Sequence, residues 1–234
     1  MTIDELTGAG FTVDPAAYER LAHFVAHLEE ENQNLNLTAI RDTRAVWELH
    51  VCDSLSLMPL AGENIPARLL DLGTGGGIPG IPLACVWPEC EVTLLDATRK
   101  KLLAAERIVE KIGLSNVQTL WGRAEDLAHV PGHREQFDVV AVRAVGPLPT
   151  VVEYAAGFVR RGGQCWFEKS VSSADRETED ARRAAGLCGL QFSGIHKYVL
   201  PAEHGERAVV IYDKRSLLRH DLPRQQGLPK RKPL

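Results

Sequence analysis

Between about residues 68 and 186, the chain alternates between short apolar runs and longer segments whose apolar residues recur at helical spacing. Short apolar runs of this kind are typical of strands, and the segments between them have the length of crossover helices. The alternation predicts an α/β fold with a doubly wound, mostly parallel sheet. The expected strands lie at 68–72, 91–95, 117–121, 137–142 and 163–168, and the expected helices at about 78–87, 98–112, 147–160 and 173–186.

The chain on either side of this alternation has a different pattern. Residues 15–30 place their apolar side chains on one helical face, and a second helical pattern runs from about 43 to 58. Two further β-like runs, 191–199 and 207–213, are joined only by PAEHGE, which permits an antiparallel pair and forbids a parallel crossover. We therefore expect three parts: an N-terminal helical extension (1–64), an α/β domain (65–213) and a basic C-terminal tail (214–234).

Composition places the chain among globular proteins. With 234 residues it is long enough for one substantial core and a small appendage. No apolar run approaches the roughly 18 residues of a membrane span, and MTIDELTGAG has no basic or apolar segment of a secretory signal, so we expect a cytoplasmic protein. The five cysteines lack metal-ligand spacing, so we interpret them as small apolar residues and predict no metal site.

The formal net charge of −4 gives no overall sign of nucleic-acid binding, but the charges are unevenly distributed. Residues 1–31 carry seven acids against Arg20 alone, and residues 214–234 carry seven bases against Asp221. A basic tail can contact phosphates, and it can equally be a solvated, frayed terminus. The tail alone does not decide between the two.

A glycine-rich loop, LLDLGTGGGIPGIPLA (69–84), follows the first predicted strand. Its glycines let the backbone approach a nucleotide-like ligand, because no Cβ is in the way. Gly75-x-Gly77-x-x-Gly80 fits the dinucleotide fingerprint, whereas Asp71-x-Gly73-x-Gly75-x-Gly77 fits the loop of S-adenosylmethionine enzymes. The loop predicts a cofactor site and leaves two cofactors open.

Acidic residues at the strand ends separate the two cofactors. Asp71, Asp96 and Glu125 follow the first three predicted strands, whose carboxyl ends meet at one edge of the sheet. Asp96 suits the ribose hydroxyls of either cofactor. Asp71 would repel the pyrophosphate of NAD and attract a cation such as a sulfonium or ammonium group. The pattern therefore favours S-adenosylmethionine.

Several segments together resemble a known family. They are NLNLTAI (34–40), HVCDSL (50–55), DLGTGGGIPGIPLA (71–84), LLDATRKK (94–101), GRAEDL (122–127) and VRAVGPL (142–148). In these segments the chain is similar to the bacterial 16S rRNA (guanine-N7) methyltransferases, the glucose-inhibited division protein B family. The resemblance implies a seven-stranded class I S-adenosylmethionine-dependent methyltransferase fold and methylation of a guanine N7 in the decoding region of 16S rRNA. It also implies that the partner is 16S rRNA or the small ribosomal subunit, and nothing indicates an obligate protein partner.

The resemblance and the strand-end pattern together give the candidate site. The cofactor-binding candidates are Gly73, Gly75, Ile78, Asp96, Ala124, Glu125 and Arg143. Arg143 is also the candidate positioning residue between cofactor and target base, with an ion pair to Asp71 or Asp138 as the structural alternative. The candidate RNA contacts are Arg99, Lys100, Lys101, Arg123, Lys169 and Arg207.

Other residue types with possible chemistry are assigned to structure. His50 and Asp53 share a helical face, for which capping or packing is the favoured role. Trp121 and Trp166 end β-like runs, so we expect them in the core. No candidate general base is evident. None is required, because the lone pair of guanine N7 is free in the neutral base.

Three alternatives stay open at this point. A methyltransferase for a small metabolite would leave the basic residues without a purpose, and an NAD-dependent oxidoreductase conflicts with Asp71. A ribosome-binding protein without catalysis would bind RNA independently of S-adenosylmethionine. None of the three accounts for Asp71, Asp96 and Glu125 together with the RAVGPL segment.

Overall fold

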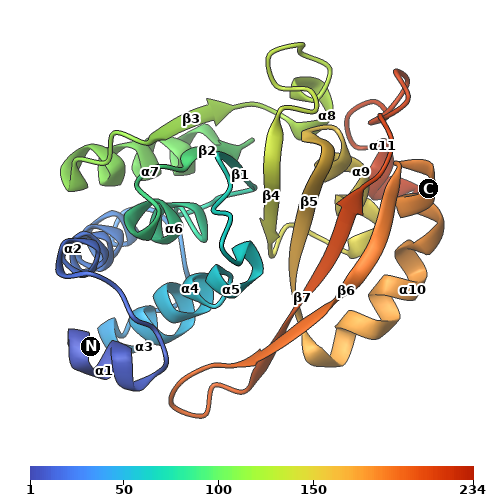
Figure 1. The fold of residues 1–234 in the computed structure, drawn as a ribbon. Helices are drawn as coiled ribbons and strands as arrows, with labels where there is room; N and C mark the ends of the chain where they lie inside the picture. The colour runs from blue at the N-terminus through green and yellow to red at the C-terminus, as the bar shows by residue number, and fades with distance from the viewer.

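The computed structural model describes residues 1–234, and seven strands form one twisted sheet in the order β3-β2-β1-β4-β5-β7-β6 (Figure 1). The first five strands are parallel, and β7 runs antiparallel between β5 and β6. The chain order reverses between β1 and β4, which confirms the doubly wound fold. The strands are β1 (Arg68–Leu72), β2 (Glu91–Asp96), β3 (Val117–Trp121), β4 (Phe137–Arg143), β5 (Val159–Ser170), β6 (Leu190–Val199) and β7 (Glu206–Lys214).

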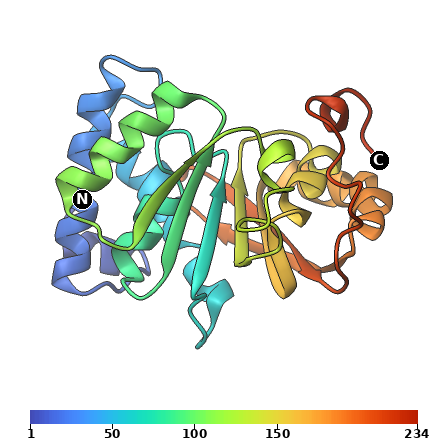
Figure 2. The same cartoon turned by 90° about the horizontal axis from the view of Figure 1, so that it is seen from above.

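Helices cover both faces of the sheet (Figure 2). The N-terminal helices lie on one face with α6 (Gly80–Val86) and α7 (Arg99–Ile112), and the later helices lie on the other. The N-terminal group is α1 (Ile3–Gly8), α2 (Pro15–Asn32), α3 (Thr43–Val46), the π-helix η1 (Trp47–Cys52), α4 (Asp53–Leu55) and α5 (Met58–Ala61). The later group is α8 (Ala124–Leu127), α9 (Leu148–Ala156), α10 (Val171–Leu187) and α11 (Leu228–Arg231). No helix combines the length and apolarity that crossing a bilayer requires.

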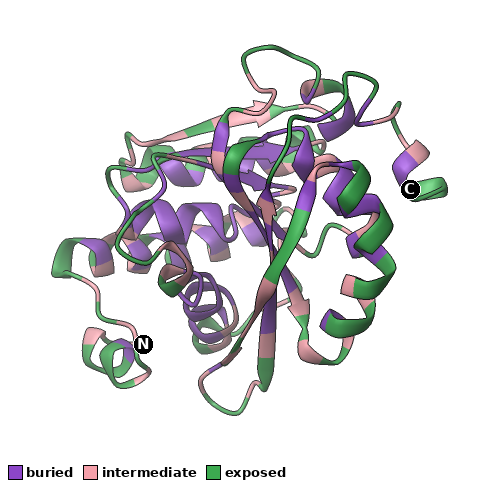
Figure 3. Cartoon of the chain, turned by 45° about the vertical axis from the view of Figure 1, so that its right-hand side comes forward, coloured by how far each residue is buried: buried purple, intermediate pink, exposed green.

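The apolar runs form strands because both faces of the sheet are covered. Successive side chains of a strand point to opposite faces, so a strand buried on both sides must be apolar at every position. In β1, Leu69 packs into the core beneath the N-terminal helices, and Leu70 packs into the core beneath α9 and α10. Figure 3 shows the result: the central strands and the inward helix faces are buried, whereas the outward helix faces and much of the edge strand β6 are exposed.

The N-terminal helices share a core with the sheet. Leu21, Phe24 and Leu28 of α2 are fully buried in the same cluster as the inward residues of β1 and β2. A Cβ placed on Gly76, in the glycine-rich loop, would lie 3.0 Å from Leu28 Cδ1 and 3.4 Å from the Cβ of Leu37. The extension therefore supports the underside of the loop that the sequence assigns to cofactor binding.

Two predicted boundaries are wrong for the same stretch of chain. The helix expected at 147–160 ends at Ala156, and the strand expected to begin at residue 163 begins at Val159. The pairing of β4 with β5 shifts register between Phe137 and Val139, because a bulge in β5 takes up the extra residues. The first residues of β5 cannot be predicted from the sequence, because RRGG at 160–163 is polar and does not resemble a buried strand.

The helix expected at 43–58 is interrupted by a π-helical turn. The interruption, η1, covers Trp47–Cys52 and lies between α3 and α4. Such turns widen a helix locally and are frequent at functional sites. Here the turn carries His50 and the carbonyl of Leu49 to Arg143 at the end of β4, where both contact its guanidinium group.

The basic tail is packed against the protein rather than frayed. Arg134 donates hydrogen bonds to the carbonyls of Leu218 and Leu222, at 3.0 and 2.9 Å. Arg224 forms an ion pair with Glu153, which is fully buried in α9. A buried carboxylate needs such a partner, so this ion pair fixes the path of the tail.

We expect Leu28→Ala to lower the free energy of unfolding by about 2–5 kcal/mol, because it opens a cavity beneath the glycine-rich loop. Urea denaturation monitored by circular dichroism measures the change. The control is Leu217→Ala, at a position that is 65% exposed, which should shift the free energy by less than about 0.5 kcal/mol. Equal effects of the two substitutions would contradict a shared core.

Candidate active site

The glycine-rich loop is braced from below by Asp71, the fourth residue of β1. Asp71 is fully buried, and its Oδ2 accepts hydrogen bonds from the Thr74 hydroxyl at 2.6 Å and the Gly80 amide at 2.8 Å. Its Oδ1 has no hydrogen-bond partner. Burial raises the pKa of this carboxyl to about 6, against the two hydrogen bonds, which lower it. Asp71 therefore shapes the loop from within the protein core.

Asp96 fixes the same loop from the side. The residue ends β2, and its Oδ2 accepts a hydrogen bond from the Gly75 amide at 2.9 Å. Its Oδ1 accepts from the Thr98 amide at 2.6 Å. Each oxygen keeps a further lone pair, so the carboxylate can also accept from a pair of ligand hydroxyls.

A hollow of about 260 Å³ lies above these strand ends. It is bounded by the ends of β1, β2 and β3, by the start of α8 and by the loop after β4. Four of the cofactor candidates line it, namely Gly73, Asp96, Ala124 and Glu125. We call it the donor hollow.

The other three cofactor candidates do not line the donor hollow. Gly75 contributes its amide to Asp96 instead, and Ile78 packs into the core shared with the N-terminal helices. Arg143 lies in a neighbouring hollow. The family segment predicts the loop as a whole, and the sequence does not show which of its residues line the hollow and which hold the loop.

Glu125 forms the far wall of the donor hollow together with Tyr154. Glu125 is 5% exposed, and its Oε1 accepts a hydrogen bond from the Gly227 amide of the C-terminal tail at 2.8 Å. Burial, together with the charge of Glu125, raises the pKa of Tyr154 to about 12. The tyrosine is therefore a neutral hydroxyl at the edge of the hollow, and the tail completes the wall behind Glu125.

The loop after β4 closes over the glycine-rich loop. Gly73 has a φ of +80°, and a Cβ on it would lie 2.3 Å from Cγ2 of Val145. Only glycine fits both this backbone conformation and this contact. Ala144, before the valine, is held at a φ of +54°, which is uncommon for a residue with a side chain. The two loops are thus packed together with strain at Ala144.

Ala144 also lines a second hollow of about 320 Å³, beyond the ends of β4 and β5. We call it the acceptor hollow. Its ionisable lining consists of three acids and three bases, namely Asp53, Glu168, Glu177, Arg143, Lys169 and Arg207. The two hollows therefore meet at Ala144, so that a ligand in one can reach a ligand in the other.

Arg143 is held by the N-terminal extension. Its Nη2 donates to the carbonyl of Leu49 at 2.9 Å and lies 3.1 Å from Nδ1 of His50, and its Nη1 lies 3.3 Å from Oδ2 of Asp53. Its Nε lies 3.8 Å from Glu168. Neither Asp71 nor Asp138 pairs with it, so the partners that we expected in the structural alternative are wrong. Asp138 pairs with Arg160 instead.

Sequence reasoning missed all three acids of the acceptor hollow. In the sequence, capping or packing is the favoured role of Asp53, and neither Glu168, at the end of β5, nor Glu177, in α10, is among the candidates. The Tyr198 hydroxyl donates to Asp53 at 2.6 Å. Burial, and then the negative charge of Asp53, raise the pKa of Glu168 well above its usual range. The signal that could have found Glu168 is its place at a strand end, the criterion applied to Asp71 and Asp96.

His50 is neutral in this environment. Burial, and then the positive charge of Arg143, lower its pKa to about 4. Its Nε2 lies 2.8 Å from the Thr38 hydroxyl, within the NLNLTAI segment. The NLNLTAI segment therefore contacts, through Thr38, the residue that contacts Arg143.

The six expected RNA contacts fall into two groups. Lys169 is largely buried, and its Nζ donates to the carbonyl of Gly146 at 2.8 Å and pairs with Glu177 at 2.7 Å. It therefore ties the loop after β4 to α10. Arg207 lines the acceptor hollow. The remaining four, Arg99, Lys100, Lys101 and Arg123, lie at the start of α7 and the end of β3.

The two tryptophans expected in the core differ. Trp166 is 1% exposed and lies in the core, as predicted, whereas Trp121 is 56% exposed, so its prediction is wrong. The reason is its position in the sheet. β3 is an edge strand, and Trp121 is its last residue, beyond the cover of the flanking helices.

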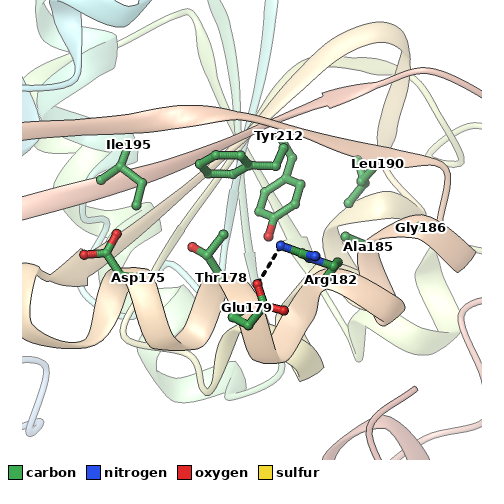
Figure 4. Close-up of a pocket in the computed structure, with 10 residues that line it drawn as sticks. Asp175, Thr178, Glu179, Arg182, Ala185, Gly186, Leu190, Ile195 and Tyr212 are labelled. Carbon is green, nitrogen blue, oxygen red and sulfur yellow. Dashed lines mark ion pairs between the residues drawn. The ribbon is translucent and has the colours of Figure 1, made fainter.

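A further hollow of about 370 Å³ lies between α10 and strands β6 and β7 (Figure 4). Leu190, Ile195 and Tyr212 form its floor, and the ion pair between Glu179 and Arg182 lies at its rim. It shares no residue with the donor or acceptor hollow and contains no part of the glycine-rich loop. It is not the cofactor site.

The donor hollow fits S-adenosylmethionine. Asp96 suits ribose hydroxyls, and two acids, Asp96 and Glu125, face the hollow against one base, Arg123. This acidic lining favours a cationic ligand over a pyrophosphate. Asp71, which we expect to attract a cation, is fully buried, accepts hydrogen bonds from the loop and does not line the hollow.

Comparisons with known proteins agree with this geometry. The family model described as rRNA small subunit methyltransferase G matches residues 17–206. The ribosomal RNA small subunit methyltransferase G of Desulfitobacterium hafniense (strain Y51) is 38% identical over 216 residues, covering 92% of this chain and 89% of that one. Its counterpart in Roseiflexus castenholzii is 36% identical over 236 residues, covering 99% of this chain and 100% of that one.

A solved structure shares the fold. The O-methyltransferase TomG from Streptomyces achromogenes, in complex with SAM, superposes with a TM-score of 0.56 at 18% identity. The match covers 92% of this chain and 96% of that one. The predicted class I methyltransferase sheet is confirmed.

We expect Asp71→Asn to remove a pH dependence of stability. Between about pH 4 and 6 the folded protein holds a proton on Asp71 that the unfolded chain has released, because the pKa rises from 3.8 to about 6 on folding. The free energy of unfolding therefore falls by up to about 3 kcal/mol across this range and is flat above it. Asparagine keeps an acceptor for Thr74 and Gly80 but does not titrate.

Urea denaturation of both proteins across this pH range tests the expectation. The free energy of unfolding of the wild type, minus that of Asp71→Asn, should decline towards pH 6 and then stay constant. A difference that does not vary with pH would show that Asp71 is not the titrating group.

We expect Asp96→Ala to weaken S-adenosylmethionine binding about 10- to 100-fold, since it removes the acceptor for ribose and releases the Gly75 and Thr98 amides. Isothermal titration calorimetry measures the dissociation constant. Asp126→Ala is the matched control, because Asp126 is an exposed acid of α8 that does not line the hollow. Equal affinities of the two variants would remove Asp96 from the cofactor site.

Proposed function

The chain belongs to the rRNA small subunit methyltransferase G family, and from this premise we propose that it methylates N7 of a guanine in 16S ribosomal RNA. The proposed donor is S-adenosylmethionine, and the proposed target lies in the decoding region. The partner is 16S rRNA itself or the small ribosomal subunit. We place the protein in the cytoplasm, with the ribosomes that it modifies.

The junction of the two hollows at Ala144 carries this proposal. Transfer of a methyl group needs donor and acceptor to meet in line, with the reacting atoms about 3–3.5 Å apart. The donor hollow has the acidic lining that suits the cofactor, and the acceptor hollow has the polar lining that suits a base. Ala144 lines both hollows, so a ligand in one would lie close to a ligand in the other.

In the proposed complex, Asp96, Glu125 and Gly73 hold the cofactor. S-adenosylmethionine supplies an electrophilic methyl group when it is bound. The chain contributes a rigid floor, since Asp71 and Asp96 hold the glycine-rich loop through its backbone amides and the Thr74 hydroxyl. The loop after β4 packs onto Gly73 through Val145 and so fixes one side of the donor hollow.

The acceptor hollow needs no general base. Guanine N7 carries its lone pair in the neutral base, so no proton has to leave before the methyl group arrives. The guanine becomes cationic on transfer, and the negative charge of Asp53 and Glu177 lies where it can stabilise that charge. Arg143, fixed by Leu49, His50 and Asp53, is the positioning residue.

The experiment incubates the full-length protein with methyl-labelled S-adenosylmethionine and small ribosomal subunits from cells that lack it. The RNA is then digested to nucleosides. The proposal expects label in 7-methylguanosine. Label in another nucleoside would overturn the N7 assignment, label only in a small metabolite would overturn the RNA substrate, and RNA binding without any label would indicate a ribosome-binding protein.

We expect Arg143→Lys and Arg143→Ala to lower kcat for the small subunit by about 10²-fold or more, because a misplaced acceptor loses alignment with the donor. The dissociation constant of S-adenosylmethionine should stay within about twofold, since Arg143 does not line the donor hollow. Arg161→Ala, at an exposed arginine of β5, is the matched control. Unchanged kcat in Arg143→Lys, the variant that keeps the buried charge, would remove Arg143 from this role.

A further inference from the structure

Trp121 is an exposed aromatic ring at the mouth of the donor hollow. It is 56% exposed, whereas Trp47, Trp87 and Trp166 are between 1% and 4% exposed. Its Nε1–H donates to the carbonyl of Ala97 at 3.2 Å, which fixes the indole at the rim. The next two residues, Gly122 and Arg123, line the donor hollow. A large apolar surface is thus held rigidly in solvent beside the site.

A cation lies across the ring. The guanidinium carbon of Arg99 is 5.1 Å from the ring centroid of Trp121, within the range of a cation–π contact. Arg99 is itself exposed, so the pair presents an aromatic ring and a positive charge to solvent. Surfaces that combine an aromatic plane with arginine are suited to the π-face of a nucleobase.

The four basic residues expected to bind RNA near Trp121 have no carboxylate partner within the protein. None of Arg99, Lys100, Lys101 and Arg123 forms an ion pair with a carboxylate. Lys169, in contrast, is committed to Glu177. Arg99, Lys100 and Lys101 occupy the first turn of α7, where positive charges interact unfavourably with the helix dipole. Their interaction with the dipole therefore does not stabilise the fold. Their charge is available to an anionic partner.

We propose that Trp121 and Arg99 form a stacking platform for an unpaired base of the RNA substrate, with Lys100 and Arg123 binding the adjoining phosphates. The proposal rests on the proposed function in that RNA is taken as the substrate. An aromatic plane with uncommitted cations complements an unpaired nucleotide, which offers a π-face and a phosphate together. A paired helix would present phosphates but no free base face to the ring.

The stacked base is not the guanine that is methylated. The platform lies at the end of β3, and the acceptor hollow lies beyond β4 and β5. From β3 to β4 the sheet has three strand spacings, which amount to about 14 Å. A single nucleotide does not bridge that distance while lying flat on the ring. The platform therefore binds a neighbouring nucleotide and holds the strand while the target base enters the acceptor hollow.

Steady-state kinetics with small ribosomal subunits tests the platform. Base–aromatic stacking contributes about 1–3 kcal/mol, so Trp121→Ala should raise KM for the subunit about 5- to 150-fold, while Trp121→Phe should retain most of the affinity. The dissociation constant of S-adenosylmethionine should not change. Phe192→Ala, which removes an exposed ring from β6, is the matched control and should leave KM within about twofold.

Fluorescence gives a readout that does not depend on methyl transfer. Because the other three tryptophans are buried, a quencher in solution such as acrylamide reaches Trp121 preferentially. A short single-stranded oligoribonucleotide should protect this fluorescence from acrylamide, and the protection should be absent in Trp121→Phe. The same sequence as a duplex should protect it less.

The outcomes separate this proposal from the proposed function. An unchanged KM in Trp121→Ala, or equal protection by single strand and duplex, overturns the platform even if 7-methylguanosine forms. A rise in the dissociation constant of S-adenosylmethionine that matches the rise in KM also overturns it, because the ring would then act on the cofactor. Protection by the single strand without any labelled 7-methylguanosine would keep the platform and overturn the methylation assignment.

Discussion

The glycine-rich loop takes its shape from the buried carboxyl of Asp71, which accepts from the Thr74 hydroxyl and the Gly80 amide. Burying a carboxyl is unfavourable, and the raised pKa of Asp71 reflects this. The two hydrogen bonds to Asp71 offset part of this cost, and Asp96 holds the same loop from the side. The donor hollow, the loop after β4 that packs on Gly73 and the junction at Ala144 are all positioned relative to that loop. Two acids that suggest ligand contacts thus act largely on the protein's own backbone.

The N-terminal extension looks like an appendage in sequence and is part of the site in space. Leu28 and Leu37 pack beneath Gly76, and η1 brings Leu49 and His50 to Arg143. The donor side and the acceptor side therefore both depend on residues before β1. A protein with the sheet alone would have the strand-end acids but no fixed orientation for Arg143.

The fold could be predicted because parallel strands buried on both faces leave an unmistakable pattern of apolar runs. The start of β5 could not, because a bulge places RRGG within a strand, and neither could the exposure of Trp121, which depends on the sheet edge. In the site, strand-end position identified Asp96 and Glu125. The place of Asp53 in the site could not be predicted, because it depends on the contact between Asp53 in α4 and Arg143 at the end of β4. The spacing of residues in the sequence does not indicate that contact.

The hydrogen bond from Gly227 to Glu125 joins the end of the chain to the wall of the donor hollow. During synthesis every strand of the sheet leaves the ribosome before residue 227, which follows β7 in the chain. The wall behind Glu125 is consequently the last part of the site to form.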